Sequence, residues 1–326
     1  MSRLVTIYGG AGFAGRYIAR RMAKSGWRVR VATRDPNEAM EVRTYGVVGQ
    51  VSPILCNIRD EDSTRAAMRG ADVVINCVGL TGEKRKNTFD AVQAEGAERV
   101  ARLADEEGVG HLVHFSAICA DSESASGYAR TKAEGEAAVL AHMPGAAIIR
   151  PSVIFGTEDK FFNSFATLAR FTWVLPVVQA ERLYQPVYVD DVAAAAAALA
   201  ASGQGGTYEL GGPEVKSLRE LLGDLATVTR RRRLVINLPG LFGRLTAGMG
   251  DFASWISLGI IPSPISRDRL KAMTADNVVS DEALSFADLG IEPTPMANIL
   301  PDYLWRFRPS GQFMAIKDSA QNLRNT

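Results

Sequence analysis

The chain has 326 residues, of which 47% are hydrophobic, and its 37 basic and 36 acidic side chains give a formal charge of +1. This length and composition predict a globular protein with a sizeable core, and the balanced charge excludes the basic field on which nucleic acid binding depends. Cys56, Cys77 and Cys119 are scattered and lack the spacing of a disulfide framework or a metal site, so we expect neither.

The cysteine pattern indicates a reducing compartment, the cytoplasm. The first predicted element is a strand from Leu4 to Tyr8, and because it starts so early we expect no signal or transit peptide. The strand runs directly into a glycine-rich turn, and the spacing of apolar residues from Arg16 to Lys24 predicts a helix after it. A strand, a glycine-rich turn and a helix in this order are typical of a dinucleotide-binding site.

The glycines of this turn have separate expected roles. Gly9 or Gly10 permits the tight turn, and Gly12 leaves out a side chain that would block a pyrophosphate. Gly15 lets the helix pack closely on the strand, which aims the helix N-terminus at the phosphates. We therefore predict that this turn binds a dinucleotide.

Strand-like and helix-like segments then alternate along the chain. The predicted strands are Val29 to Thr33, Val51 to Cys56, Val73 to Val78, Leu112 to Ser116 and Ala147 to Arg150, with helices that include Ser63 to Met68, Asp90 to Glu107 and Thr131 to His142. Val187 to Val189 and Thr207 to Leu210 are short late strands, and the alanine-rich helix between them, Val192 to Ala201, is expected to press against the sheet. This alternation predicts an α/β fold, a Rossmann-type doubly wound parallel sheet.

The alternation weakens after Leu218, which predicts a smaller, mostly helical C-terminal lobe. We expect residues 1–215 to form the nucleotide-binding domain, residues 216–308 the smaller lobe with an apolar docking surface, and residues 309–326 a polar tail. This tail is either a disordered end or an arm that orders on a partner. The longest charge-free run, Phe252 to Ser266, is shorter than the about 20 apolar residues of a transmembrane helix, so we expect no transmembrane segment.

The apolar, glycine-rich stretch that follows Arg230 to Arg233 carries only two charges before Arg267, namely Arg244 and Asp251. With Trp255, this stretch is suited to lie on a membrane or on a partner protein, and the arginines are suited to acidic lipid or an acidic subunit. The alternative is an ordinary core with solvated charges, and the sequence leaves both interpretations open.

The end of the second predicted strand selects between dinucleotides. It reads Ala32-Thr33-Arg34-Asp35, where NAD-selective sites place a carboxylate against the ribose hydroxyls. A neutral threonine followed by an arginine is suited instead to hydrogen-bond and neutralise a 2′-phosphate. We therefore predict NADP(H). The alternative is that Arg34 is a surface arginine and that Asp35 binds the ribose.

Tyr128 and Lys132 lie four residues apart, on one face of a predicted helix after the fifth strand. A nearby cation lowers the pKa of a tyrosine, so such a pair is suited to acid–base chemistry at a carbonyl or an alcohol. Together with Arg150 to Gly156 and Val187 to Ala193, the pattern resembles the extended short-chain dehydrogenase/reductase superfamily over residues 4–215.

This resemblance implies a set of cofactor contacts at the glycine-rich turn, at the ends of the strands and on the helix of the Tyr–Lys pair. The residues are Gly9, Gly12, Phe13, Ala14, Gly15, Thr33, Arg34, Asn57, Ile58, Cys77, Val78, Gly79, Ser116, Tyr128, Lys132 and Pro151. It implies no metal ligand.

The sequence departs from the superfamily at the hydroxyl that holds the substrate oxygen. Ile118 stands at the position that we align with the catalytic serine, and Ser116 lies two residues early. Loss of this hydroxyl removes one of the donors that stabilise charge in the transition state. We therefore assign no catalytic residue and treat Tyr128, Lys132 and Ser116 as vestigial candidates. Tyr128 and Lys132 keep a second role, hydrogen bonds to the nicotinamide ribose.

Four segments resemble one branch of this superfamily: Gly9 to Tyr17, Val31 to Pro36, Tyr128 to Glu136 and, above all, Arg150 to Asn163. That branch is the nucleotide-binding accessory subunit family of respiratory complex I, NADH:ubiquinone oxidoreductase. The resemblance implies a tightly held NADP(H) with a structural role, other complex I subunits as partners and, for a bacterial version, a peripheral position on the cytoplasmic face of the inner membrane. The alternative is a soluble NADP-dependent reductase, epimerase or dehydratase that uses Tyr128 and Lys132.

Overall fold

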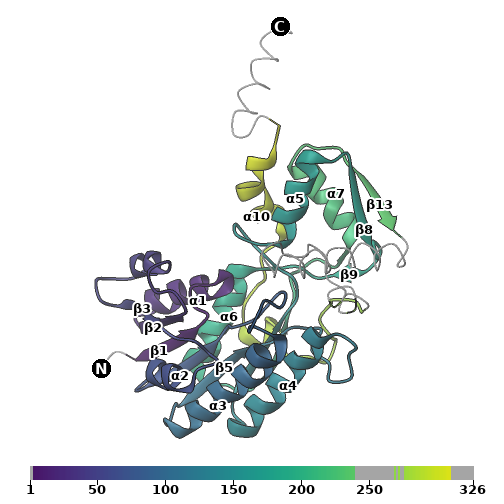
Figure 1. Ribbon diagram of the computed structural model, residues 1–326. Coiled ribbons are helices and arrows are strands. Elements are labelled where there is room, and N and C mark those ends of the chain that lie inside the picture. The colour runs from purple at the N-terminus through teal and green to yellow at the C-terminus, as the bar shows by residue number, and fades with distance from the viewer. Residues whose placement is uncertain (1–2, 239–267, 269–270, 272–274, 310–326) are drawn as a thin grey trace.

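The computed structural model describes residues 3–238, 268, 271 and 275–309. Figure 1 shows a sheet flanked by helices and, above it, a smaller lobe. No helix within the described ranges is long and apolar enough to cross a membrane. The apolar stretch with Arg244, Asp251, Trp255 and Phe252 to Ser266 lies outside the described residues, as does the predicted tail after Pro309.

The sheet has seven strands in the order β11-β6-β5-β4-β1-β2-β3, and each neighbouring pair is parallel. The strands are β1 (Leu4–Tyr8), β2 (Arg28–Thr33), β3 (Val51–Leu55), β4 (Val73–Asn76), β5 (His111–Phe115), β6 (Ala147–Pro151) and β11 (Gly206–Leu210). The strand order reverses between β1 and β4, which leaves a crevice at their carboxyl ends. The predicted α/β, Rossmann-type doubly wound parallel sheet is confirmed.

Helices cover both faces of this sheet (Figure 1). α1 (Phe13–Lys24) and α6 (Val189–Ser202) lie on one face, and α2 (Glu61–Met68), α3 (Glu95–Glu106) and α4 (Gly127–His142) lie on the other. Ile18 and Met22 of α1 pack with Ala196 and Leu199 of α6 in the core of the first face. The alanine-rich helix therefore presses against the sheet, as predicted.

Several helices begin earlier than the sequence pattern predicts. α1 begins at Phe13 rather than Arg16, because Gly12 in extended conformation is its N-cap. α4 begins at Gly127, because the Ser126 side chain accepts a hydrogen bond from the Ala129 N–H and so caps the helix. The segment predicted as one helix from Asp90 opens with a π-helical turn, Asp90–Ala94, before α3.

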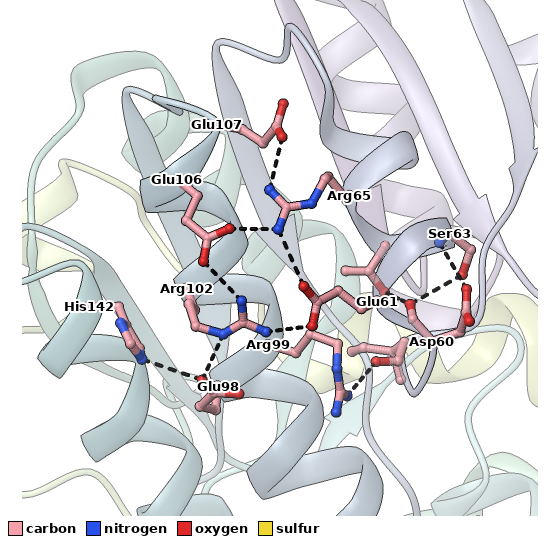
Figure 2. Close-up of polar contacts among 12 residues, drawn as sticks. Asp60, Glu61, Ser63, Arg65, Glu98, Arg99, Arg102, Glu106, Glu107 and His142 are labelled. Atoms are coloured by element: carbon pink, nitrogen blue, oxygen red, sulfur yellow. Dashed lines mark hydrogen bonds and ion pairs between the residues drawn. The ribbon is translucent and has the colours of Figure 1, made fainter.

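A network of ion pairs joins α2 to α3 on the outer surface of the molecule (Figure 2). Arg65 lies 3.3 Å from Glu61 and 2.6 Å from Glu106, and Arg102 lies 2.8 Å and 2.9 Å from the same two carboxylates. An exposed ion pair alone contributes little to stability. Here, however, two carboxylates are each shared by two arginines, which fixes the position of one helix on the other.

The smaller lobe has an apolar cluster of its own. It is built mainly from α5 (Phe161–Phe171), β8 (Val174–Val178), α7 (Leu218–Val228), β13 (Leu234–Leu238) and α10 (Met296–Leu304). α7 starts with a capping box between Ser217 and Glu220. Residues on both sides of position 215 share this cluster, and the division of the chain at 215 stays a prediction. Further along, Phe286 returns to the core of the sheet.

A loop after the short strand β7 (Ile154–Phe155) connects the lobe to α1. A Cβ atom built on Gly156 of this loop would lie 3.3 Å from the Phe13 ring. Two residues further, Glu158 accepts a hydrogen bond from the Tyr17 hydroxyl at 3.2 Å. Residues 156–159 therefore rest on the first turns of α1, beside the glycine-rich turn.

The segment Glu158 to Asn163, the most specific part of the sequence resemblance, fastens this loop to the lobe. Asp159 is buried and accepts a hydrogen bond from the Tyr303 hydroxyl at 2.6 Å. Arg306 donates to Asn163 Oδ1 at 2.6 Å. The specific sequence of this segment thus has a structural reason, because its side chains hold α10 and the residues after it.

Candidate functional site

A cleft of about 410 Å³ opens at the carboxyl ends of β1, β2, β3 and β4. It lies where the strand order reverses, the usual ligand position in sheets of this type. The predicted cofactor contacts that line it are Gly9, Gly12, Thr33, Arg34, Asn57, Ile58, Cys77, Val78 and Gly79. The structure therefore brings these residues together in one cleft.

The glycine-rich turn separates β1 from α1 at this cleft. Gly9 has φ +73°, and a Cβ atom there would lie 3.2 Å from the Cys77 carbonyl group at the end of β4. Gly9 is therefore the turn glycine, and it also allows β1 and β4 to approach each other. The turn is closed by hydrogen bonds from Gly10 N–H to the Ile7 carbonyl at 3.2 Å and from Gly12 N–H to the Gly9 carbonyl at 2.8 Å.

The first turn of α1, which contains the predicted contacts Phe13 and Ala14, is suited to a phosphate. Gly12 caps the helix without a side-chain hydrogen bond, and the turn holds no acidic residue, so its N–H groups are available to an anion. Gly15 differs from its predicted role. A Cβ atom on Gly15 would lie 2.3 Å from the Gly9 carbonyl oxygen, so Gly15 lets the helix approach the turn itself rather than the strand.

Thr33 and Arg34 form the rim of the cleft at the end of β2. Arg34 is exposed, and no side-chain hydrogen bond or ion pair joins it to another residue in the described part of the chain. Asp35, the alternative ribose ligand, accepts hydrogen bonds from the N–H groups of Asn37 at 3.0 Å and Glu38 at 3.2 Å. One carboxylate oxygen of Asp35 is therefore used within the turn, whereas the Arg34 guanidinium is available to a ligand.

Asn57 and Ile58 form a wall of the cleft after β3. Asn57 N–H donates to Ser63 Oγ at 3.1 Å, and Asn57 Oδ1 accepts from Arg59 N–H at 3.2 Å. Arg99 of α3 donates to the Ile58 carbonyl at 2.9 Å. These bonds fix the shape of the wall without the help of a ligand.

Lys132 lies beside the cleft although it does not line it. Its side chain is 4% exposed, its Nζ donates to the Phe115 carbonyl at 2.8 Å, and a Cβ atom on Gly79 would lie 3.5 Å from that Nζ. Burial lowers the pKa of Lys132 to about 8. A buried ammonium next to a cleft residue is suited to donate to a ligand hydroxyl.

Two buried polar atoms that have no partner in the described chain lie on β5 and directly after it, near Lys132. Ser116 Oγ and His114 Nε2 have no hydrogen-bond partner within the described residues, although buried polar groups are normally paired. Burial and, second to it, the nearby Lys132 ammonium lower the pKa of His114 to about 3, so the imidazole is neutral. Ser116, which does not line the cleft, therefore has a hydroxyl with an unused hydrogen-bonding capacity.

The remaining predicted residues lie around the exit of β5 and the start of α4. Tyr128 is in the first turn of α4, where its ring packs edge to face on Phe89 with the centroids 5.8 Å apart. Its N–H donates to Asp268 at 3.2 Å. Pro151 ends β6, and its carbonyl accepts from Ile118 N–H at 3.3 Å. Neither Tyr128 nor Pro151 lines the cleft.

The buried Lys132 ammonium should make stability depend on pH. Its pKa is about 8 in the folded chain against 10.5 for the free group, so the unfolded chain binds more protons between these values and stability rises with pH. Lys132→Met removes this contribution. We expect the difference in unfolding free energy between the wild type and Lys132→Met to change by about 1 kcal/mol between pH 7 and pH 9, in favour of the wild type.

Urea unfolding of both proteins without nucleotide measures this difference. Lys24→Met is the matched control, because Lys24 is exposed at the end of α1. A pH-independent difference for Lys132→Met, or an equal change for the control, would contradict the assignment.

Sequence reasoning missed part of the cleft lining, namely Tyr8, Ala11, Ala32, Glu38, Ala39, Cys56, Leu80, Asn87 and Val92. Leu80 and Asn87 belong to the segment after β4, which carries no motif. The rule that ligands bind at the carboxyl ends of parallel strands would have pointed to this segment. Within the described ranges, no group of three or more His, Cys, Asp and Glu side chains is arranged to hold a metal ion.

Comparison with known proteins relates this cleft to a family. The NAD dependent epimerase/dehydratase family model matches residues 5–211. The mitochondrial NADH dehydrogenase (ubiquinone) 1 alpha subcomplex subunit 9 of Arabidopsis thaliana is 35% identical over 316 residues, which cover 94% of this chain and 79% of that protein. The chain belongs to the NAD dependent epimerase/dehydratase family and, within it, to the family of this subunit 9.

The chain is also similar to an enzyme in sequence, and to a second one in fold. The ceramide reductase of Caulobacter vibrioides is 31% identical over 268 residues, which cover 80% of each chain. The UDP-glucose 4-epimerase of Thermus thermophilus, solved in complex with NAD, has a TM-score of 0.69 at 20% identity and covers 94% of this chain and 99% of its own. The last likeness concerns the fold alone.

Proposed function

We propose that this chain is an accessory subunit of respiratory complex I that binds NADP(H) as a structural element and supports the peripheral arm near the membrane. The observation that carries the proposal is the 35% identity to a complex I subunit over 94% of the chain. The other subunits of the complex are then its partners. As a bacterial version it acts at the cytoplasmic face of the inner membrane, as a peripheral protein.

The choice of NADP(H) rests on the end of β2. A 2′-phosphate at this rim is neutralised by Arg34 and hydrogen-bonded by the Thr33 hydroxyl. The carboxylates of Asp35 and Glu38 also line the cleft and oppose this charge, but Asp35 accepts two turn N–H groups through Oδ1. One oxygen of Asp35 is thus directed at the turn backbone, and Arg34 is the cation among the described residues that line the cleft, so it is the residue suited to pair with the phosphate.

The pyrophosphate lies against the first turn of α1 in this proposal, and the nicotinamide ribose lies near Gly79. Lys132 and Tyr128 then donate to the ribose hydroxyls, and Ser116 Oγ gains the partner that it lacks in the described chain. A nicotinamide supplies hydride chemistry when bound, but no hydroxyl stands at position 118 to hold a substrate oxygen. The chain therefore has no independent catalytic activity.

A bound nucleotide would stabilise the fold by mass action. A thousandfold excess of ligand over its dissociation constant contributes about 4 kcal/mol. That is a large fraction of the stability of an ordinary domain, so a structural role is enough to retain the site.

The second candidate function is an NADP-dependent reductase or epimerase that uses Tyr128 and Lys132. The relation to a ceramide reductase favours it, as does the Ser116 hydroxyl, which has no partner among the residues that the structure describes.

Fractionation of native membranes separates the two functions. We expect the chain to migrate with NADH:quinone reductase activity and to release NADP(H) on denaturation. A chain found free in the cytosol that oxidises NADPH with a carbonyl substrate would overturn the accessory function in favour of the enzyme. Release of NAD(H) alone would leave the accessory function standing and overturn the assignment of the nucleotide.

A further inference from the structure

The outer edge of the smaller lobe carries exposed aromatic and aliphatic side chains. In Figure 1, β8 and β13 form this edge, on the far side of α5 and α7. Trp173 is 79% exposed, Phe171 is 77% exposed and Leu234 is 63% exposed. Single exposed apolar residues are normal on protein surfaces, but a contiguous group of large ones marks a contact site.

The pairing of β8 with β13 places Leu234 beside Trp173, whose carbonyl accepts a hydrogen bond from the Leu234 N–H at 3.1 Å. The two strands are parallel, with Leu234 opposite Val174 and Ile236 opposite Pro176, so these four side chains share one face. The other face, with Leu175, packs in the lobe. On the outer face, Leu234, Ile236 and Pro176 are exposed, so no element of the described chain buries them.

Arginines surround this face. Arg233 lies over the Trp173 ring, 4.8 Å from its centroid, and Arg170 lies 5.8 Å from the centroid of the Phe171 ring. Arg233 also donates to the Ala169 carbonyl at 2.8 Å, which holds it at this edge. The pKa of Arg231 is lowered mainly by partial burial and, in addition, by the charges of Arg233 and Arg170. The positive charges are therefore close enough to repel one another.

The two segments that form this edge carry no acidic side chain to balance the charge. The sequence has no Asp or Glu from Lys160 to Ala180 or from Leu225 to Leu238. Within the described residues, none of Arg170, Arg231, Arg232 and Arg233 makes an ion pair. Because the whole chain has a formal charge of only +1, this edge is a local excess and not part of a general basic surface.

We propose that this edge, formed by Phe171, Trp173, Leu234 and Ile236 with Arg170 and Arg231 to Arg233, binds the surface of an anionic phospholipid bilayer. Tryptophan and arginine are suited to the interface, where the ring lies at the level of the head groups and the guanidinium meets lipid phosphates. The rings protrude from an edge rather than fill a groove. A fluid lipid surface adapts to such protrusions without a matched pocket.

Vesicle flotation with the purified full chain tests the proposal. We expect binding to vesicles that contain about a third phosphatidylglycerol, weak binding to pure phosphatidylcholine, and suppression of the binding by salt. Since each basic residue contributes about a factor of five near an anionic surface, Arg170→Glu with Arg232→Glu should weaken binding at least tenfold.

Lys24→Glu with Arg43→Glu is the matched control, because it removes the same charge from exposed sites on and beside α1. It should leave binding nearly unchanged. Phe171→Ser with Trp173→Ser keeps the net charge and should abolish binding. An unchanged circular dichroism spectrum shows that each variant folds. No binding by the wild type, equal loss in the control, or full binding by both edge variants would overturn the proposal.

An acidic protein partner is a separate outcome. If the wild type binds no vesicles but Arg170→Glu with Arg232→Glu is lost from isolated complex I, the edge binds another protein subunit and the lipid proposal is wrong. Because vesicle binding needs no other subunit, its failure leaves the complex I proposal standing.

Discussion

Gly15→Ala should abolish retention of the nucleotide and destabilise the chain by about 3 kcal/mol. The added Cβ atom would lie 2.3 Å from the Gly9 carbonyl oxygen and 2.6 Å from Gly10 Cα. Both contacts are with backbone, so no side chain can rotate away. The start of α1 must move from the turn instead, which displaces the N–H groups that are suited to a phosphate.

Gly223→Ala is the matched control, since Gly223 also lies inside a helix, in α7, but has no heavy atom within 4 Å of its Cβ position in the described part of the chain. Alanine is a better helix former than glycine, so this variant should be more stable by about 0.5–1 kcal/mol. Thermal unfolding and analysis of the nucleotide that copurifies measure both effects. If Gly15→Ala retained the nucleotide as the wild type does, the assignment of the phosphate site to the glycine-rich turn would be wrong.

Arg34→Glu should lower the affinity for NADP(H) by at least about a hundredfold and leave the affinity for NAD(H) nearly unchanged. The substitution removes a charge-assisted hydrogen bond to the 2′-phosphate, which is worth about 1.5–3 kcal/mol, and adds a repulsive charge. Arg34 is exposed at the rim of the cleft, so the fold should be preserved. Isothermal titration of the apo chain with each nucleotide measures the two affinities.

Arg28→Glu is the control for this experiment, because Arg28 is exposed at the other end of the same strand. It should bind NADP(H) as the wild type does. If Arg34→Glu keeps its affinity and Asp35→Asn loses it, the ribose is bound by Asp35 and the cofactor is NAD(H).

The fold could be predicted well because its signals are local. The strands of the sheet are short and mostly apolar, and they alternate with helix-like segments, which is the pattern of a parallel sheet covered by helices on both faces. The position of the cleft followed from the glycine-rich turn, whose roles need only the φ angle of Gly9 and the space around Gly12 and Gly15.

The smaller lobe could not be predicted in the same way. Its cluster combines Phe155 and Phe162 with Leu221 and Leu300, which lie far apart in the sequence. The pairing of β8 with β13 is equally non-local, so the exposed edge at Trp173 has no signature in either segment alone. The arginines Arg230 to Arg233 were visible in the sequence, but their neighbours were not.

The contacts around Lys132 show a third kind of limit. Its four-residue spacing from Tyr128 predicted one helix face, and both residues do lie in α4. The spacing does not predict the hydrogen bond to the Phe115 carbonyl, nor that the Ser116 hydroxyl has no partner among the described residues, because both depend on the position of β5. Burial, pKa and hydrogen-bonding capacity become known only when the helix is placed on the sheet.

The loop 156–159 rests on the first turns of α1 and holds the lobe through Asp159 and Tyr303. A change that displaces this loop should therefore also displace the first turn of α1, whose N–H groups are suited to a phosphate. We expect the packing of the lobe and the binding of a nucleotide to fail together when this loop is displaced.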